Sequence, residues 1–349
     1  MCHSCQKFCL VLRAFLIYTF NKVKILYKMC PALAGSFFDS ERKGVWWMNK
    51  RLIRVIIFLM ALPFLVTGMA GTWNNPALCV SPALATEEIG PSFQQVPDYQ
   101  PLQKQLKEYL ARQPGVYGIY FKDLHSGVSF DINGDEPVTA ASTVKVPVVL
   151  YLNHLVAQGK LDWDDRVVYD SKQDYQGGAG ILQFAARDGD SYSLRVLANL
   201  SITISDNIAY RMLVRHLGKD NVAQFMRDLG GQTVFPGGEN ITTARDMGRY
   251  MEAVLEFSRE HPALGERLLD DMAHPIYHVG LPGKLPPKVR VAHKEGDVWG
   301  VANDVGIVFA EHPYILVVLS RGETDVDKGF ARIAEISRMV YDYQMNLKR

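Results

Sequence analysis

The segment Ser142-Thr143-Val144-Lys145, followed by the apolar run 146–152, constrains this chain more than any other stretch. Residues three apart on a helix lie on one face, so a helix that begins here brings Ser142 and Lys145 together. A serine in the first turn also lies near backbone N–H groups that lack a partner within the helix. The lysine can then take or share the hydroxyl proton, which makes a weak nucleophile usable. One such pair can occur by chance in a chain of this length, so further motifs are needed to show whether this pair belongs to an active site.

Composition excludes several classes of function. The chain has 349 residues, 48% of them hydrophobic, and a formal net charge of +1, so nucleic acid is not an expected partner. All five cysteines lie at or before Cys79, which is typical of an exported protein without disulfides; they are Cys2, Cys5, Cys9, Cys30 and Cys79. Cys2-x-x-Cys5 has no second pair at ligand spacing, and we predict no metal site and no cofactor. Four scattered histidines are interpreted as packing or surface residues: His154, His216, His274 and His278.

The N-terminal part has the pattern of a secretory signal. A second possible start, Met48, is followed by a basic segment at 49–54, an apolar segment at 55–70 and a small-x-small site at 83–85. We therefore predict that residues 48–85 are a signal peptide. Because the gap between the apolar segment and the cleavage site is long, an uncleaved membrane anchor is the alternative.

The remaining N-terminal residues carry no such pattern. We interpret residues 1–47 as a start-site artefact or an extension without a catalytic role, and 86–98, with its prolines, as a linker. The expected location is secreted or extracytoplasmic, with membrane contact only through an uncleaved anchor.

Periodicity places a single domain at residues 99–346. Helical spacing over 102–112 is followed by two β-rich runs at 116–124 and 128–132, and strands return at 289–294, 303–309 and 314–320. An amphipathic helix at 325–343 ends the domain. The region from about 160 to 275 shows mainly helical patterns. We predict an α/β (α+β) fold, in which an antiparallel sheet is flanked by N- and C-terminal helices and carries an inserted all-helical domain, with a site in the cleft between them.

Two further units complete a constellation. Ser205-Asp206-Asn207 stands at the start of a predicted helix, where all three residue types also serve as ordinary caps. Lys294-Glu295-Gly296 is predicted to end a strand, where exposed charges are common. Three units in the order Ser-x-x-Lys, Ser-Asp-Asn and Lys-x-Gly, one in each structural segment, are difficult to obtain by accident.

On these motifs the chain resembles the class A β-lactamases and penicillin-binding D,D-peptidases, and more closely the β-lactamase-related serine hydrolases of bacteria. The resemblance covers about residues 99–346 and includes 242–247, which resembles the opening of the helix after the Ω loop. It implies that Ser142 is the nucleophile and that Lys145 is its base or part of the proton relay. It also implies that Ser205 carries a proton to the leaving nitrogen, and that Asn207 hydrogen-bonds the substrate amide and Lys145.

The same resemblance assigns the strand unit. Lys294 would supply positive charge near Ser205 and the substrate, and Glu295 and Gly296 would contact the substrate. The backbone N–H groups of Ser142 and Asp297 would form an oxyanion hole for acyl transfer through a serine ester.

Two departures from the family pattern bear on activity. The Ω loop, at 230–242, is short and lacks Glu-x-x-Leu-Asn, so Glu239 is its sole carboxylate and the one candidate water base; otherwise Glu239 is an exposed turn residue. Glu295 replaces the hydroxyl residue that binds a substrate carboxylate, and its charge would repel that group. Either Glu295 points elsewhere, paired with Lys294 or a neighbouring arginine, or the substrate lacks the carboxylate.

The sequence thus predicts an exported active-site serine hydrolase, acting as a monomer on an amide or ester. The substrate would be a small molecule or a peptidoglycan peptide, with weak or no β-lactamase turnover. One alternative is a true class A-type β-lactamase, and another is a catalytically idle envelope-binding protein. The five retained polar residues speak against the idle protein; they are Ser142, Lys145, Ser205, Asn207 and Lys294.

Overall fold

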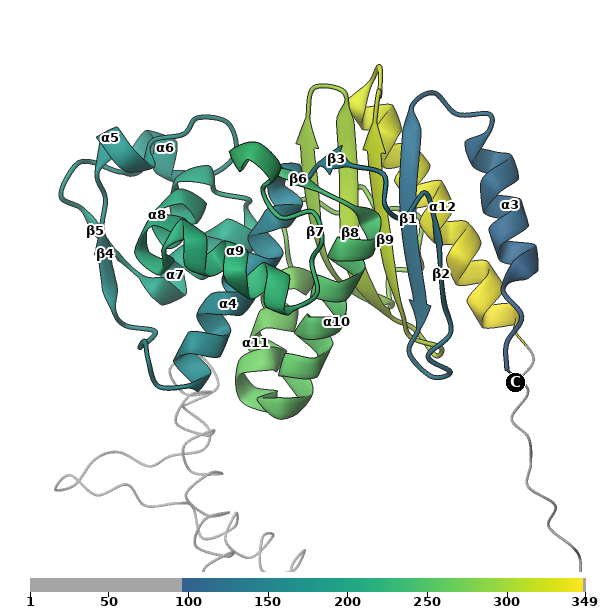
Figure 1. Ribbon diagram of the computed structural model, residues 1–349, viewed down its shortest axis with the longest axis horizontal. Helices are drawn as coiled ribbons and strands as arrows, with labels where there is room; N and C mark the ends of the chain where they lie inside the picture. Colours follow the sequence, from purple (N-terminus) through teal and green to yellow (C-terminus); the bar gives the residue numbers. More distant parts are fainter. Residues whose placement is uncertain (1–95, 348–349) are drawn as a thin grey trace, which may run out of the picture. The chain divides into compact units, whose positions relative to one another are not determined.

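A five-stranded antiparallel sheet, in the order β2-β1-β9-β8-β7, organises the domain (Figure 1). The structure, a computed structural model, describes residues 96–347, which lie within one compact unit, Ile89–Arg349. The predictions for 1–47, for 48–85 and for most of the linker 86–98 lie outside the described residues. The strands are β1 (Val116–Asp123), β2 (Ser129–Ile132), β7 (Arg290–Val298), β8 (Val301–Phe309) and β9 (Tyr314–Arg321).

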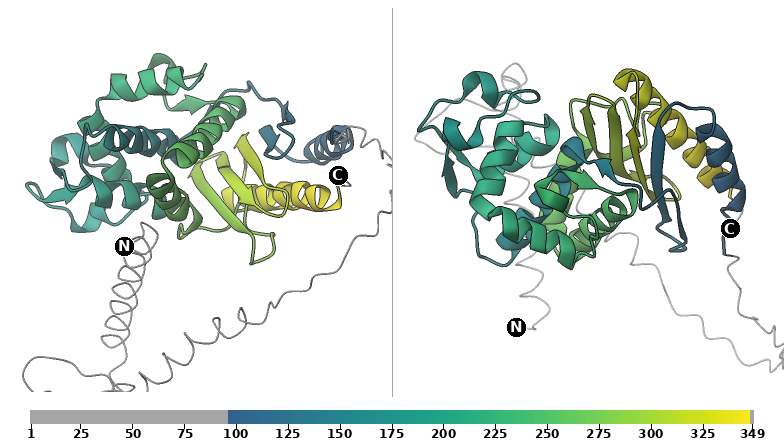
Figure 2. Two further views of the ribbon diagram at one scale, coloured as in Figure 1. Left: turned by 90° about the horizontal axis from the view of Figure 1, so that it is seen from below. Right: turned by 45° about the horizontal axis from the view of Figure 1, so that its top comes forward.

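One face of the sheet is covered by the two terminal helices, α3 (Gln100–Leu110) and α12 (Val326–Asn346) (Figure 2). Their apolar residues recur at helical spacing, so each helix has a single stripe to bury. Leu102 and Leu106 of α3, and Ile333 and Ile336 of α12, are fully buried in this layer. Within residues 96–347, no helix is both long and apolar enough to cross a membrane.

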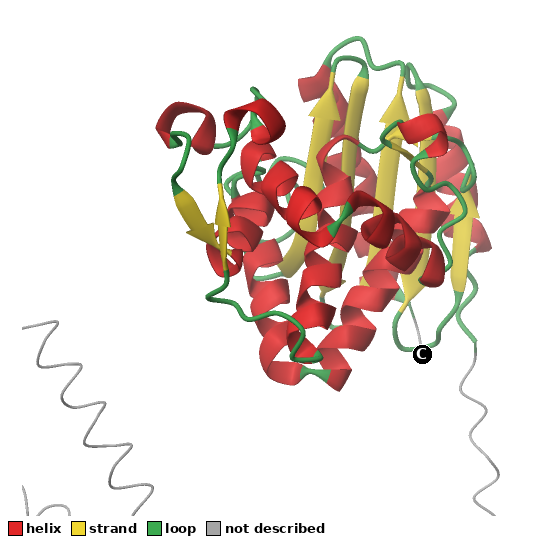
Figure 3. Cartoon of the chain, turned by 60° about the vertical axis from the view of Figure 1, so that its left-hand side comes forward, coloured by secondary structure: helices red, strands yellow, loops and turns green. Residues whose placement is uncertain are grey.

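The helices on the other face include α4 (Lys145–Ala157), α10 (Ala244–Glu260) and α11 (Pro262–Ala273) (Figure 3). The sequence of α4 is apolar on nearly all sides, and such a helix is stable only inside a protein. It packs against the surrounding helices α7 to α11. The Ser142-x-x-Lys145 motif therefore stands at the head of a helix that is enclosed by five other helices.

The predicted helical insertion, about residues 160–275, is too long at its C-terminal end, because it includes α10 and α11, which pack against the sheet. Helical periodicity does not show whether a helix packs on a sheet or on other helices. The remaining helices of the predicted region lie before α10. They are α5 (Ser171–Asp174), α6 (Leu182–Ala185), α7 (Leu194–Thr203), α8 (Asn207–Leu217) and α9 (Lys219–Asp228). The predicted fold class is confirmed, but the region also contains short strands that the sequence did not show. Strand β4 (Arg166–Val168) pairs with β5 (Ser191–Ser193), and β6 (Ile241–Thr242) pairs with β3 (Val138–Thr139). Strands of two or three residues are too short for an alternating pattern to reveal them.

A buried ion pair ties the β7–β8 hairpin to the start of α12. Arg332 Nη1 donates to Glu323 Oε2 at 2.6 Å, and the hydroxyl of Tyr117 donates to the other carboxylate oxygen. The Glu323 backbone N–H donates to the Gly300 carbonyl oxygen at 2.9 Å. Burial, with the Glu323 carboxylate second, raises the pKa of Tyr117, so its hydroxyl keeps its proton and remains a donor.

Replacing Arg332 by alanine would leave the fully buried Glu323 carboxylate without its cation. We expect Arg332→Ala to lower the free energy of unfolding, measured in urea, by about 3–5 kcal/mol. Lys328→Ala is the matched control, because Lys328 pairs with Asp325 in an exposed position on the same helix. That control should cost less than about 1 kcal/mol, and equal losses for the two variants would contradict the prediction.

Candidate active site

Ser142 lies in a 3₁₀ turn, Ala141–Val144, that runs directly into α4. Ala141 has a φ of 49°, a left-handed conformation that is uncommon outside glycine. The turn is held in this conformation from the side of the Ω loop. The Ala140 N–H donates to the Asn240 carbonyl oxygen at 2.8 Å, and Asn240 Nδ2 donates to the Ala141 carbonyl oxygen at 2.9 Å.

The sheet holds the same turn through Asn303, a buried residue of β8. Asn303 Nδ2 donates to the carbonyl oxygens of Thr139 and Ala140 at 2.9 and 3.3 Å, and Asn303 Oδ1 accepts from the Ser320 N–H at 2.9 Å. Neither asparagine was among the predicted site residues. Asn240 lies in the loop before β6, and Asn303 lies beside Asp304 in β8, so neither position shows a pattern that predicts its distant backbone partners.

Lys145 is almost fully buried and joins the first two motifs. Its Nζ donates to Ser142 Oγ at 2.9 Å, to Asn207 Oδ1 at 2.8 Å, and to the carbonyl and hydroxyl oxygens of Ser205 at 2.7 and 3.2 Å. Burial, followed by the nearby charge of Lys294, lowers the pKa of Lys145 to about 7. A large fraction of Lys145 is therefore neutral near pH 7 and able to accept the Ser142 proton.

Asp206 fixes the backbone around the second motif through its carboxylate. Its Oδ1 accepts from the N–H groups of Ile208 and Ala209 and so caps α8. Its Oδ2 accepts from the N–H groups of Ile181 and Leu182 at 2.7 and 2.9 Å. The cap expected from the sequence is present, and the same carboxylate fixes the glycine-rich loop against α8.

The third motif lies within β7, at the edge of the sheet. A Cβ atom at Gly296 would lie 2.7 Å from the Ser142 backbone nitrogen and 2.9 Å from that of Thr143, so only glycine permits this approach. The prediction that the motif ends its strand was wrong, because pairing with β8 continues to Val298. Asp297 follows Gly296 with an exposed side chain, and its N–H stays our candidate for the oxyanion hole.

Lys294 and Glu295 form an ion pair within this motif. Lys294 is fully buried, and its Nζ donates to Glu295 Oε1 at 2.5 Å and to the Glu295 carbonyl oxygen at 3.0 Å. The other carboxylate oxygen, Oε2, is buried, and no hydrogen-bond partner for it lies in the described part of the chain. Burial lowers the pKa of Lys294, and the Glu295 charge opposes that shift. Of the orientations left open by the sequence, Glu295 adopts the pairing with Lys294.

Glu239 is not part of this arrangement. It is exposed beside the Pro236–Gly238 turn, and no hydrogen bond or ion pair within residues 96–347 joins its side chain to Ser142 or Lys145. Its neighbour Asn240 contacts the nucleophile turn instead. The hydrogen-bond acceptors around the Lys145 ammonium are hydroxyl, carbonyl and amide oxygens, with no carboxylate among the described residues.

Exposed apolar side chains flank the motifs on two sides. Asn207 Nδ2 donates to the Gly177 carbonyl oxygen at 3.0 Å, and the segment around Gly177 exposes Tyr175 and Phe184. On the β7 side, Trp299 follows Asp297 and Val298 and is 96% exposed. Large exposed apolar side chains beside a site offer contact surface to a ligand or partner.

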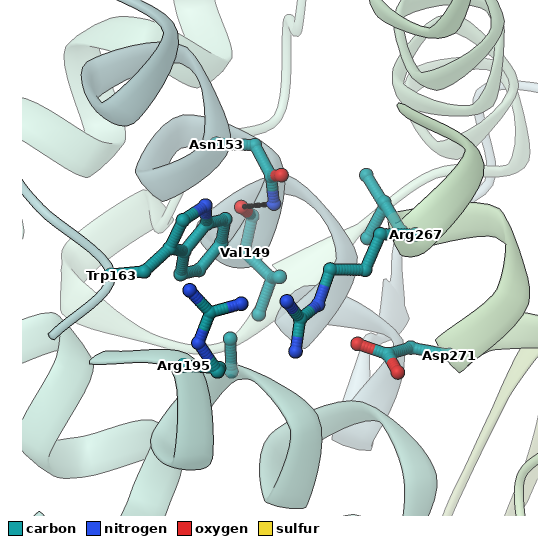
Figure 4. A pocket seen from close by; sticks show the side chains of 8 residues that line it. Val149, Asn153, Trp163, Arg195, Arg267 and Asp271 are labelled. Carbon is teal, nitrogen blue, oxygen red and sulfur yellow. Dashed lines mark hydrogen bonds between the residues drawn. The ribbon is translucent and has the colours of Figure 1, made fainter. Parts of the chain in front are cut away.

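A separate small cavity lies between α4, α7 and α11, and none of the motif residues lines it (Figure 4). The guanidinium groups of Arg195 and Arg267 both contact the ring of Trp163 there, and burial raises the pKa of Asp271. Among the described residues no group of three or more histidine, cysteine, aspartate or glutamate side chains could hold a metal ion.

The close approach at Gly296 gives a direct test of this geometry. In Gly296→Ala the new Cβ would push the Ser142 turn away from β7, and we expect labelling of Ser142 by a fluorophosphonate to slow about a hundredfold. Gly177→Ala is the control, because a Cβ there meets its nearest atoms at 3.8 Å. If circular dichroism shows that the Gly296→Ala protein is folded and its labelling rate is unchanged, the close approach of Gly296 to the Ser142 turn is not required for reactivity.

Comparison with known proteins identifies the fold and chemistry. A model described as the beta-lactamase enzyme family matches residues 101–344. The solved structure of PBP-A is 31% identical, covers 71% of this chain and 97% of its own, and superposes with a TM-score of 0.66. A PBP-A variant solved as an acyl-enzyme with penicillin G matches equally well.

Two proteins named as β-lactamases are also similar. Beta-lactamase SME-1 from Serratia marcescens is 25% identical over 265 residues, which are 68% of this chain and 86% of that protein. A β-lactamase structure from Sphaerobacter thermophilus is 25% identical, covers 72% of this chain and 98% of its own, and has a TM-score of 0.65. The chain therefore belongs to the beta-lactamase enzyme family and is a serine hydrolase with acyl-enzyme chemistry.

Proposed function

We propose that this protein is an exported, monomeric hydrolase in which Ser142 is acylated by an amide or ester of the cell envelope, such as a peptidoglycan stem peptide. In this proposal β-lactams acylate the serine but are turned over weakly or not at all. The carrying observation is the set of contacts made by Lys145. Lys145 provides a base whose pKa suits acylation, and within residues 96–347 no carboxylate hydrogen-bonds to Lys145 to help activate water.

The proposed acylation uses residues already in contact. Neutral Lys145 takes the Ser142 proton across 2.9 Å, and Oγ attacks the carbonyl carbon. The backbone N–H groups of Ser142 and Asp297 stabilise the oxyanion, a contribution of roughly 2.7–4 kcal/mol per donor in other enzymes. As the bond to nitrogen breaks, Ser205 Oγ, 3.2 Å from Lys145 Nζ, passes the proton to the leaving amine.

The position of the site supports an envelope substrate. The α3 helix begins at one end of the sheet, and the β7–β8 hairpin, beside the Ser142 turn, lies at the other end (Figure 1). A protein attached through the predicted linker would therefore present its site away from the attachment. The exposed Tyr175, Phe184 and Trp299 side chains would suit a substrate that extends beyond the reacting bond.

Two alternative functions lead to different expectations. A true β-lactamase would need Glu239 as its water base; the relatives named as β-lactamases favour this alternative, whereas the exposed position of Glu239 speaks against it. A catalytically idle binding protein would have no need to bury Lys145 against the side chains of Ser142, Ser205 and Asn207.

The first test follows the acyl-enzyme directly. The chain from residue 86 onward is incubated with a fluorescent penicillin, and the intact mass is followed over time. We expect a lasting adduct that is absent in Ser142→Ala and has the same lifetime in Glu239→Gln. Rapid loss of the adduct in the wild type, slowed by Glu239→Gln, would instead establish the β-lactamase. Absence of any adduct with both penicillin and an activated ester would establish the idle protein.

The pH dependence of acylation tests the role of Lys145. Below its pKa of about 7 the ammonium cannot accept a proton, so the acylation rate should fall about tenfold for each pH unit well below that value. Above about pH 8 the amine is neutral and the rate should level off. Stopped-flow fluorescence with the same penicillin measures the profile. A flat profile from pH 5 to 9, roughly, would exclude Lys145 as the base.

A further inference from the structure

Within the described part of the chain, the carboxylate of Glu295 is hydrogen-bonded through only one of its two oxygens. Its side chain is only 6% exposed; Oε1 accepts from Lys294, while no residue within 96–347 donates to the buried Oε2. Rotation of the carboxylate exchanges the two oxygens, so one of them always lacks a partner. Buried charged oxygens are nearly always hydrogen-bonded in native proteins, so the buried Oε2 is a position where a donor from a bound substrate would be favourable.

This carboxylate lies within the reacting site. Glu295 immediately precedes Gly296, whose backbone touches the Ser142 turn. Its charge also acts on Lys145, because it raises the pKa that burial and Lys294 lower. A substrate bound along β7 with its carbonyl carbon at Ser142 therefore passes the Lys294–Glu295 pair.

The balance of charge between Lys294 and Glu295 determines which chemical group of a substrate can bind beside the pair. Lys294 is already neutralised by Glu295, and within residues 96–347 no arginine forms a hydrogen bond or ion pair with that carboxylate. A free carboxylate on the substrate would meet the Glu295 charge in a buried, poorly screened place. A neutral N–H group would instead donate to the unpartnered oxygen and leave the ion pair intact.

We propose that the Lys294–Glu295 pair selects substrates that present a neutral amide N–H, in place of a free carboxylate, beside the bond that is cleaved. The enzyme would then act on internal or amidated peptide bonds rather than at a free C-terminus. This proposal rests on the acylating function proposed above and specifies its substrate class.

The test uses three thioesters with one acyl group and leaving thiols that end in a carboxylate, a carboxamide or a methyl ester. In each case Ser142 Oγ forms the ester bond, the carbon–sulfur bond breaks, and the Ser142 proton passes through Lys145 to the leaving thiolate. Thiol release measures acylation. For the wild type we expect the carboxamide to react fastest and to exceed the carboxylate by at least about tenfold. The methyl ester, which lacks a donor, should lie between them.

Glu295→Gln keeps the shape and removes the charge. It should raise the carboxylate rate and bring the three rates to within about threefold of one another. Glu295→Thr should likewise increase acylation by penicillin, and it replaces the first variant if Glu295→Gln does not fold. Glu311→Gln, at an exposed position in the loop between β8 and β9, is the control and should keep the wild-type order.

The outcomes separate this proposal from the function on which it rests. Equal rates for the three thioesters in the wild type, or a wild-type order in both Glu295 variants, would overturn the selection by Glu295 and leave the acylating hydrolase in place. No reaction of Ser142 with any of the thioesters would overturn the acylating function, and the selection with it.

Discussion

The buried ammonium of Lys145 is the constraint on which the site depends. A cation that is removed from water must be surrounded by acceptors, and here they come from two separate segments, the turn before α4 and the start of α8. The lysine can be buried at this point only because α4 itself is buried on nearly all sides. The position of the nucleophile motif at the head of the central helix is thus what brings Ser205 and Asn207 to Ser142.

Local strain accompanies this arrangement and is stabilised by neighbouring elements. Ala141 and Ser205 both have a positive φ, at 49° and 56°, and each such residue costs on the order of 1–3 kcal/mol. Asn240 donates to the Ala141 carbonyl oxygen, and Asn303 donates to the carbonyl oxygen of the preceding residue. Asp206, which directly follows Ser205, caps α8 and so fixes the backbone there. These three polar side chains contact no reacting atom, yet they determine where Ser142 and Ser205 lie.

The sequence predicted those parts of the structure that follow from local chemistry. The apolar periodicity located the sheet and the terminal helices, and the spacing of Ser142 and Lys145 predicted their contact. The roles of Asn240 and Asn303 were not predictable, because their partners are backbone atoms far away in the chain. The extent of β7 was also missed, since the charges at Glu295 and Asp297 resemble a strand end until the pairing with β8 is known.

The positions of the carboxylates around the site bear on both steps of the reaction, acylation of the serine and hydrolysis of the acyl-enzyme. The resemblance to β-lactamases places a glutamate beside the hydrolytic water and a hydroxyl beside the substrate carboxylate. In this chain a glutamate, Glu295, precedes Gly296 beside the Ser142 turn, and the Ω-loop carboxylate, Glu239, lies exposed on the surface. The Glu295 charge partly offsets the effect of Lys294 on Lys145, so the base for acylation keeps a pKa near 7 despite its burial. The same carboxylate is placed to favour proton transfer from Ser142 and to disfavour an anionic substrate, and no described carboxylate hydrogen-bonds to Lys145 to assist water. Under the proposed function, the described side chains would therefore favour formation of the acyl-enzyme over its hydrolysis.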